Sequence, residues 1–172
     1  MIERYADNLW KSTIESVQRL VAVAGSESTV LLDTVVLDVG KGFFVLTYSQ
    51  TGLSCEFFES LTDLRWSGDS GLRIGQSSID EWLELRSISA AERVPELPLR
   101  VQRMTGLFGV GEYEDVFSLE LSGGSDTLVL MTTDSFDLVC GNLEAALARA
   151  EKVARNMGLN LTRESLPEGG TW

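Results

Sequence analysis

The sequence predicts an α+β domain in which an N-terminal and a C-terminal amphipathic helix pack on one face of a curved antiparallel β-sheet. Apolar residues recur at helical spacing at each end of the chain, and β-branched and aromatic runs fill the middle. Short glycine-containing turns separate those runs. Consecutive strands joined by short turns pair in antiparallel fashion, and amphipathic helices bury their apolar stripes against such a sheet.

The first expected element is a helix that ends near Gly25. Its apolar residues follow one another at helical spacing, with Glu, Lys, Gln and Arg between them. The stripe consists of Ile2, Tyr5, Leu9, Ile14, Val17 and Val21. Gly25 suits the position after a helix, where the backbone often becomes left-handed.

Strands are expected from Ser28 to about Phe58, with hairpin turns at residues 40–42 and 50–52. The meander is expected to continue over residues 61–66, followed by a loop at residues 67–71.

Residues 77–88 are ambiguous. Ser78 and Glu81 have the spacing of a helical capping box, whereas residues 83–86 alternate as a half-buried strand does. Residues 89–100 contain Pro95 and Pro98 and are expected to form a connector, because proline cannot donate to a strand ladder.

The clearest hairpin pairs residues 116–122 with residues 128–133 around a turn at 123–126. The last element is a helix with the apolar face Leu143, Leu147, Ala150, Val153, Ala154 and Met157, followed by Gly158. Residues 164–172 are expected to be a disordered tail, so the single domain is set at residues 1–163.

Composition narrows the function classes. The chain has 172 residues and no histidine, which excludes Ser-His-Asp and Cys-His catalysis, imidazole acid–base chemistry and most zinc sites. The two cysteines, Cys55 and Cys140, lack ligand spacing and are expected to be reduced and buried. No signal segment or membrane span is apparent, so a cytoplasmic protein is expected.

The negative charge is concentrated in the middle of the chain. The formal net charge is −12, yet the opposite charges in residues 1–25 and in residues 141–172 cancel. Residues 101–140 hold seven acidic residues against a single base, Arg103. An acidic surface formed by this segment would repel nucleic acid and anionic membranes and attract basic proteins. The alternative is that the acidic residues only keep the protein soluble.

Glycines at 106, 109 and 111 predict a glycine-rich loop that forms either a flexible hairpin or a bulge. It lacks the lysine and the spacing of a phosphate-binding loop, and acids follow it, so no nucleotide or other cofactor is expected. Leu107 and Phe108 at its tip are candidate apolar anchors for a partner, with an acidic rim. The candidate partner-binding residues are Leu107, Phe108, Glu112, Glu114, Asp115, Asp134 and Asp137.

Alternative roles exist for some of these residues. Asp134 and Asp137 precede the last helix and suit N-capping. With Glu112 and Glu114 they could also ligate magnesium or calcium, although no spacing specifies a site and no metal is expected. Cys140 at the helix start would have a lowered thiol pKa, but the chain offers no histidine as its base.

No stretch carries a family signature. In general style the chain is similar to bacterial immunity proteins and to the small acidic chaperones of secretion systems. The leading hypothesis is a non-enzymatic, immunity-type inhibitor that covers a basic surface of a toxin or effector. The alternatives are a homodimeric chaperone for an effector segment and, from a different class, a metal-assisted enzyme using carboxylates.

Overall fold

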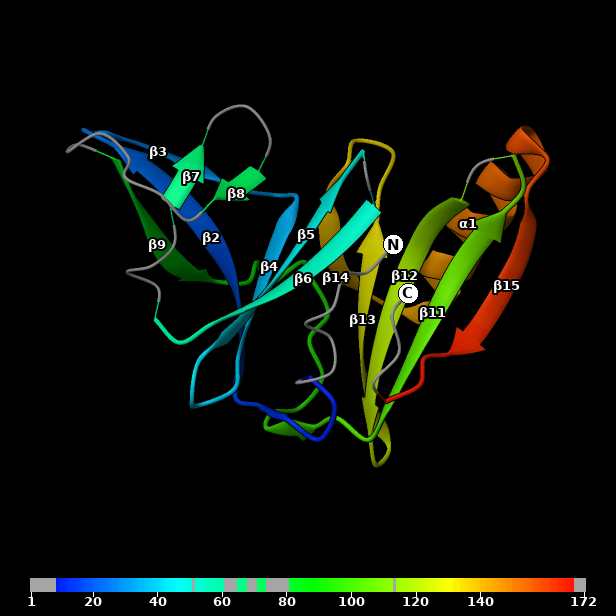
Figure 1. The fold of residues 1–172 in the computed structure, drawn as a ribbon, viewed down its shortest axis with the longest axis horizontal. Helices are drawn as coiled ribbons and strands as arrows, with labels where there is room; N and C mark the ends of the chain where they lie inside the picture. The colour runs from blue at the N-terminus through cyan, green and yellow to red at the C-terminus, as the bar shows by residue number, and fades with distance from the viewer. Residues whose placement is uncertain are drawn as a thin grey trace.

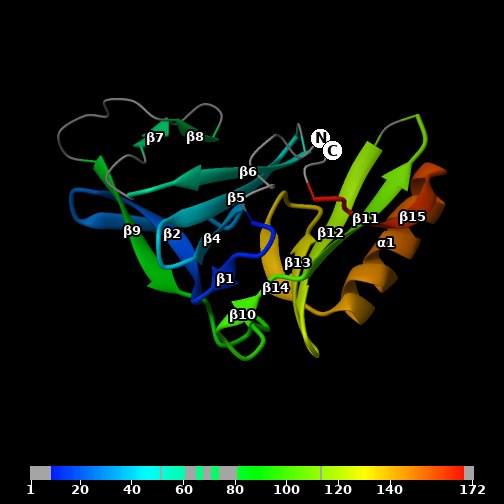
Figure 2. The ribbon, with the colours of Figure 1, turned by 60° about the horizontal axis from the view of Figure 1, so that its bottom comes forward.

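The computed structural model describes residues 9–50, 52–60, 65–67, 71–73, 81–112 and 114–168. Within these ranges the protein is built mainly of antiparallel strands and has one helix. Two larger sheets pack against each other, and the helix lies on the face of one sheet that points away from the other sheet (Figures 1 and 2). The predicted α+β class with two helices is therefore wrong, whereas the antiparallel pairing is confirmed.

The larger sheet has six strands, in the order β3-β2-β4-β5-β6, with β9 on the other edge of β2. The strands are β2 (Ser16–Ala24), β3 (Glu27–Val30), β4 (Thr34–Asp38), β5 (Phe43–Ser49), β6 (Gly52–Phe58) and β9 (Glu81–Ser87). Both predicted hairpins are present, since β4 pairs with β5 and β5 pairs with β6, although residue 51 of the second turn lies outside the described residues. The ambiguous region becomes a strand from Glu81 onward, and residues 74–80 lie outside the described residues.

The N-terminal helix is the main error of the sequence prediction. From residue 13 to residue 24 the chain forms β1 (Thr13–Ile14) and β2, and Gly25 takes φ +60° in the β2–β3 turn. Residues 1–8 of the expected helix lie outside the described residues. Helical spacing misleads here because two residues hide the alternation of β2. Alternate residues from Val17 to Val23 are buried on one face, but this series includes the charged Arg19, and on the opposite face Leu20 is also buried. The β-branched residues of this segment also favour strands over helices.

The second sheet has five strands in the order β14-β13-β12-β11-β15. They are β11 (Arg103–Val110), β12 (Glu114–Gly123), β13 (Asp126–Thr132), β14 (Leu138–Gly141) and β15 (Asn160–Ser165). The predicted β12–β13 hairpin is confirmed. Two small pairs complete the set, β1 with β10 (Leu99–Arg100) and β7 (Arg65–Ser67) with β8 (Gly71–Arg73).

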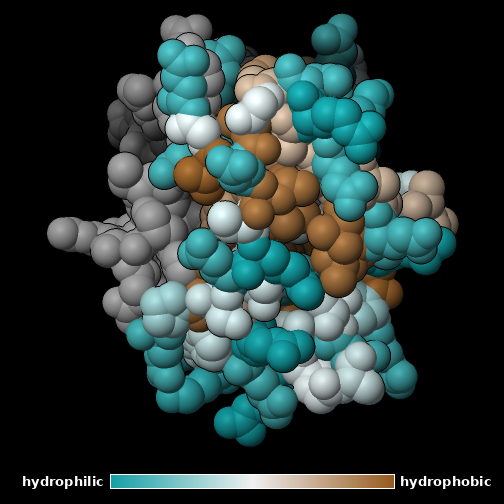
Figure 3. Space-filling view, turned by 90° about the vertical axis from the view of Figure 1, so that its right-hand side faces the viewer, coloured by the Kyte–Doolittle hydropathy of each residue, from teal (hydrophilic) through white to brown (hydrophobic). Residues whose placement is uncertain are grey.

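The predicted last helix is confirmed as α1 (Leu143–Met157), which ends at Gly158 in a left-handed conformation. Asn142 caps its first turn, because the side-chain oxygen accepts the Ala145 N–H at 2.8 Å. Its small residues Ala146, Ala150 and Ala154 are buried, which lets the helix lie close to the sheet. From the side of β15, Figure 3 shows hydrophobic residues gathered in the middle of the face and hydrophilic residues around them.

Residues that were expected to start a tail belong to the sheet. β15 pairs with β11 along its whole length, and the next residue, Leu166, is 2% exposed. The boundary predicted at residue 163 therefore falls inside a strand. Residues 169–172 lie outside the described residues.

The main core fills the space between the two larger sheets. The six-stranded sheet contributes alternate residues of β4, β5 and β6, such as Leu37, Phe44 and Leu46. The five-stranded sheet contributes residues such as Leu119 and Leu130. Two layers of apolar side chains packed face to face are the usual way in which antiparallel sheets bury their apolar faces.

Candidate functional site

The β13–β14 turn, residues 133–137, is the local structure around which the candidate site forms. Thr133 organises it: its N–H donates to the Asp137 carbonyl at 2.9 Å, and its Oγ1 accepts the Asp137 N–H at 3.1 Å. The same hydroxyl oxygen accepts the Ser135 N–H. Threonine hydroxyls stabilise turns in this way because they bond the backbone locally.

Phe136 closes this turn with an unusual backbone. Its φ is +61°, in the left-handed region that glycine or asparagine normally occupies, and its side chain is 45% exposed. A left-handed conformation costs a non-glycine residue about 1–2 kcal/mol. Such strain persists where the surroundings enforce it and is concentrated at functional sites. An exposed aromatic ring at this position is therefore the first indication of a binding surface.

The Phe136 ring is supported from below by Tyr48 at the end of β5. The two ring centroids lie 5.9 Å apart with an interplanar angle of 35°. Aromatic pairs at this distance attract each other. The contact joins the five-stranded sheet, which carries Phe136, to the six-stranded sheet, which carries Tyr48.

Tyr48 is anchored in turn by an acidic residue of β12. Its hydroxyl donates to Asp115 Oδ1 at 2.9 Å. Burial, followed by the negative charge of Asp115 and their hydrogen bond, raises the pKa of Tyr48 to about 12. The tyrosine therefore stays protonated and keeps donating to the carboxylate at physiological pH.

Arg149 of α1 ties the helix to the same region. Its guanidinium donates to Asp134 Oδ1 at 2.7 Å and to Thr132 Oγ1 at 3.1 Å, and it lies 5.4 Å from the centroid of the Phe117 ring. The Asp134 side chain is nevertheless 78% exposed, so its outer oxygen remains open to solvent. The turn is thus held by the helix as well as by its own hydrogen bonds.

The bend between β3 and β4 completes the site. The Leu32 carbonyl accepts the Leu138 N–H at 2.8 Å, and the Asp33 carbonyl accepts the Tyr48 N–H at 2.9 Å. Leu32 itself is 52% exposed. We call the surface formed by these segments the junction patch: Leu32, Asp33, Asp115, Asp134, Phe136 and Asp137.

The junction patch has the composition of a protein interface. Two exposed apolar side chains, Leu32 and Phe136, are accompanied by four carboxylates and, among the described residues, by Arg149 as the cation that bonds one of them. An apolar centre with a charged rim is a common arrangement at protein–protein contacts. Three of the residues predicted to bind a partner, Asp115, Asp134 and Asp137, belong to this patch.

The other predicted residues lie elsewhere. Glu112 and Glu114 are exposed at or beside the β11–β12 turn, next to the patch residue Asp115 along the chain. Leu107 is only 2% exposed and packs with Phe117 under α1, and Phe108 is partly buried. The expected exposed tip formed by these two residues is wrong.

Most of the glycine-rich segment lies in β11 and not in a flexible loop, and the register of β11 with β12 shifts between Leu107 and Phe108, which agrees with the expected bulge. A Cβ at Gly106 would overlap the Phe108 ring, and one at Gly109 would meet Phe117 and Leu159. Glycine is needed at both positions because large side chains cross the strand there. The cluster therefore serves packing.

Two further expectations about this region are also wrong. Asp134 and Asp137 do not cap α1, because β14 intervenes and Asn142 is the cap. Cys140 lies in β14 and not at the helix start, and burial raises the pKa of its thiol to about 12. The predicted reduced and buried state of Cys55 and Cys140 is confirmed.

Within the described ranges, no three or more carboxylate or thiol groups come close enough together to hold a metal ion. In the same residues no helix is both long enough and apolar enough to cross a membrane.

Sequence reasoning missed Leu32, Tyr48 and Phe136. Phe136 lies between two of the predicted acids, and its position in the segment Asp134-Ser135-Phe136-Asp137 was the available signal. Leu32 and Tyr48 carry no such signal, because only the tertiary fold brings them to the same turn.

Comparisons with protein-family models, with curated proteins and with solved structures find no significant match to this chain.

Proposed function

We propose that this chain is a non-enzymatic binding protein whose junction patch covers a basic surface of another protein, in the manner of an immunity protein that blocks a toxin or effector. The observation that carries the proposal is Phe136, an exposed aromatic residue held in a left-handed conformation among carboxylates.

The partner's chemistry follows from the patch. An aromatic ring attracts the guanidinium groups of arginine and the ammonium groups of lysine, and the neighbouring carboxylates form ion pairs with them. Tyr48 holds the Phe136 ring in place from beneath, so little side-chain entropy would be lost on binding. A preorganised aromatic residue at the centre of an interface often dominates its binding energy.

The test compares three single variants in affinity capture from native lysate, followed by affinity measurement on the recovered partner. Phe136→Ala removes the ring and Asp137→Lys reverses a patch charge. Glu27→Lys makes the same charge change on the exposed strand β3, outside the patch. Both charge reversals move the net charge from −12 to −10.

We expect Phe136→Ala and Asp137→Lys each to weaken binding by roughly 30-fold or more, the effect of losing a hot-spot residue, and Glu27→Lys to leave it nearly unchanged. Binding should also weaken as salt rises, because charge pairs at the rim are screened. Equal losses from the two lysine variants would mean that general acidity, and not the patch, attracts the partner. Recovery of no partner, or affinity independent of salt, would refute the proposal.

A further inference from the structure

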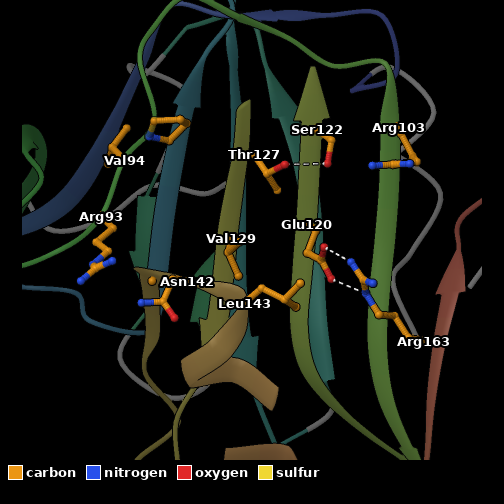
Figure 4. Close-up of a pocket in the computed structure, with 12 residues that line it drawn as sticks. Arg93, Val94, Arg103, Glu120, Ser122, Thr127, Val129, Asn142, Leu143 and Arg163 are labelled. Atoms are coloured by element: carbon orange, nitrogen blue, oxygen red, sulfur yellow. Dashed lines mark hydrogen bonds and ion pairs between the residues drawn. The ribbon is translucent and has the colours of Figure 1, made fainter. Parts of the chain in front are cut away.

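A pocket of about 440 Å³ lies at the other end of β12 and β13, away from the junction patch. It forms because α1 covers only part of the outer face of the five-stranded sheet. Beyond the helix start, the sheet presents the polar side chains Ser122 and Thr127, whose hydroxyls lie 3.0 Å apart. Figure 4 shows these residues on the floor, with the start of α1 on one side.

The charge of the pocket is opposite to that of the protein. Its lining contains three arginines, Arg93, Arg103 and Arg163, and one acid, Glu120. The lining therefore carries +2, from three positive charges and one negative, although the whole chain carries −12. A chain with 26 acidic and 14 basic residues would on average surround a surface hollow with acids, so the excess of arginine distinguishes this pocket.

One of the arginines is held rigidly. Arg163 on β15 forms two hydrogen bonds to the Glu120 carboxylate, at 3.0 and 2.6 Å, and the Glu120 side chain is 4% exposed. This pair neutralises the single acid of the pocket and gives it a fixed wall.

The other two arginines remain available. Arg93, in the connector before β10, and Arg103, on β11, lie on opposite sides of the pocket (Figure 4). Both are exposed, and neither guanidinium has an ion-pair partner among the described residues. The guanidinium fork binds carboxylate and phosphate oxygens through two parallel hydrogen bonds.

The start of α1 adds to the positive electrostatic potential of the pocket. Asn142 and Leu143 line the pocket, and the side-chain oxygen of Asn142 is used for capping, which leaves its amide group as a donor. The positive end of the helix dipole lies here, partly offset by Glu144 in the first turn.

We infer that this pocket binds a small molecule with two oxyanion groups, one held by Arg103 beside the Arg163–Glu120 wall and the other by Arg93. The volume suits a ligand of metabolite size. The inference is independent of the proposed partner, because the junction patch contributes no residue to the pocket.

Isothermal titration calorimetry with citrate and with inorganic pyrophosphate, at constant ionic strength, tests this inference. One-to-one saturable binding of at least one probe is expected, and the tighter probe identifies the ligand as carboxylate or phosphate. Arg103→Ala and Arg93→Ala should each weaken binding by about 10-fold, the loss of one charge-assisted contact.

Arg155→Ala is the matched control, since it removes the same charge from the last turn of α1, away from the pocket. It should leave the affinity unchanged. Absence of saturable binding of both probes up to about 10 mM would overturn the inference, since such affinities are too weak to be specific. An equal loss in Arg155→Ala would overturn it as well, because binding would then reflect only the overall charge.

Discussion

Arg19 on β2 and Glu92 in the connector between β9 and β10 form an ion pair whose side chains are only 4% and 15% exposed. The pair links the two sheets. Glu92 Oε1 also accepts the Cys140 N–H of β14 at 2.9 Å, and Arg19 donates to the Thr34 carbonyl of β4 at 2.8 Å. A cation from one sheet and a backbone group of the other thus share a single carboxylate.

We expect Arg19→Met to lower the free energy of unfolding by about 3–5 kcal/mol, because it leaves the Glu92 charge buried without its partner. The double variant Arg19→Met/Glu92→Gln should recover part of this loss, since the glutamine oxygen can still accept the Cys140 N–H. Urea denaturation of the two single variants and the double variant gives the coupling energy. Strictly additive losses would show that the pair contributes nothing beyond its separate groups.

The strain at Phe136 gives a second prediction. Since its φ is +61°, Phe136→Gly should be more stable than Phe136→Ala by about 1 kcal/mol, although both lose the ring contact with Tyr48. At Ser135, one position earlier and without a positive φ, the order should reverse, because glycine there only increases the entropy of the unfolded chain. Thermal unfolding of the four variants checks both orders. A Gly variant at 136 less stable than the Ala variant would mean that the backbone is not strained.

The sequence predicted the local elements of this fold better than their assembly. The hairpins of β4–β5, β5–β6 and β12–β13 are specified by alternating residues and short turns, which act over a few positions. The last helix is specified by its apolar stripe and by Gly158. For β2 the stripe gave the wrong answer, because the alternating burial of this strand is hidden in the sequence by two residues: Arg19 is a charged residue at a buried position, and Leu20 is an apolar residue on the opposite face.

The candidate site was predictable only in part, for the same reason. Local composition located Asp115, Asp134 and Asp137, which are near one another because β12 and β13 form one hairpin. Leu32 and Tyr48 come from the other sheet, and their place beside Phe136 depends on how the two sheets pack. The pocket near α1 was also not foreseen, since its arginines lie on three separate segments of the chain.

The two cysteines should be unreactive in the folded protein. Burial raises the pKa of both Cys55 and Cys140 to about 12, and the thiolate is the reactive form. With Ellman's reagent at mildly alkaline pH we expect almost no labelling of the native protein, and rapid labelling of both thiols in guanidinium chloride. Fast labelling of one thiol in the native protein would reveal local opening of its strand.

The last prediction concerns alkaline pH and follows from the Tyr48–Asp115 hydrogen bond. The pKa of Tyr48 is raised from 10.0 to about 12, chiefly by burial, so the folded protein holds this proton more tightly than the unfolded chain does. The corresponding stabilisation is fully present below pH 10 and is lost as the pH rises from there through about 12, because the unfolded chain ionises first. The raised pKa values of Cys55 and Cys140 also make the folded protein less stable as the pH rises, and their effect begins at about pH 9, the ordinary thiol pKa.

Tyr48→Phe separates the tyrosine contribution from the rest. It should lower stability at neutral pH by about 1 kcal/mol through loss of the hydrogen bond to Asp115. Above pH 10, however, its free energy of unfolding should fall less steeply than that of the wild type, because no buried phenol remains at this position to ionise. Urea denaturation at a series of pH values measures both effects. Parallel pH profiles for the two proteins would contradict the raised pKa and, with it, the support that a protonated Tyr48 gives to the Phe136 turn.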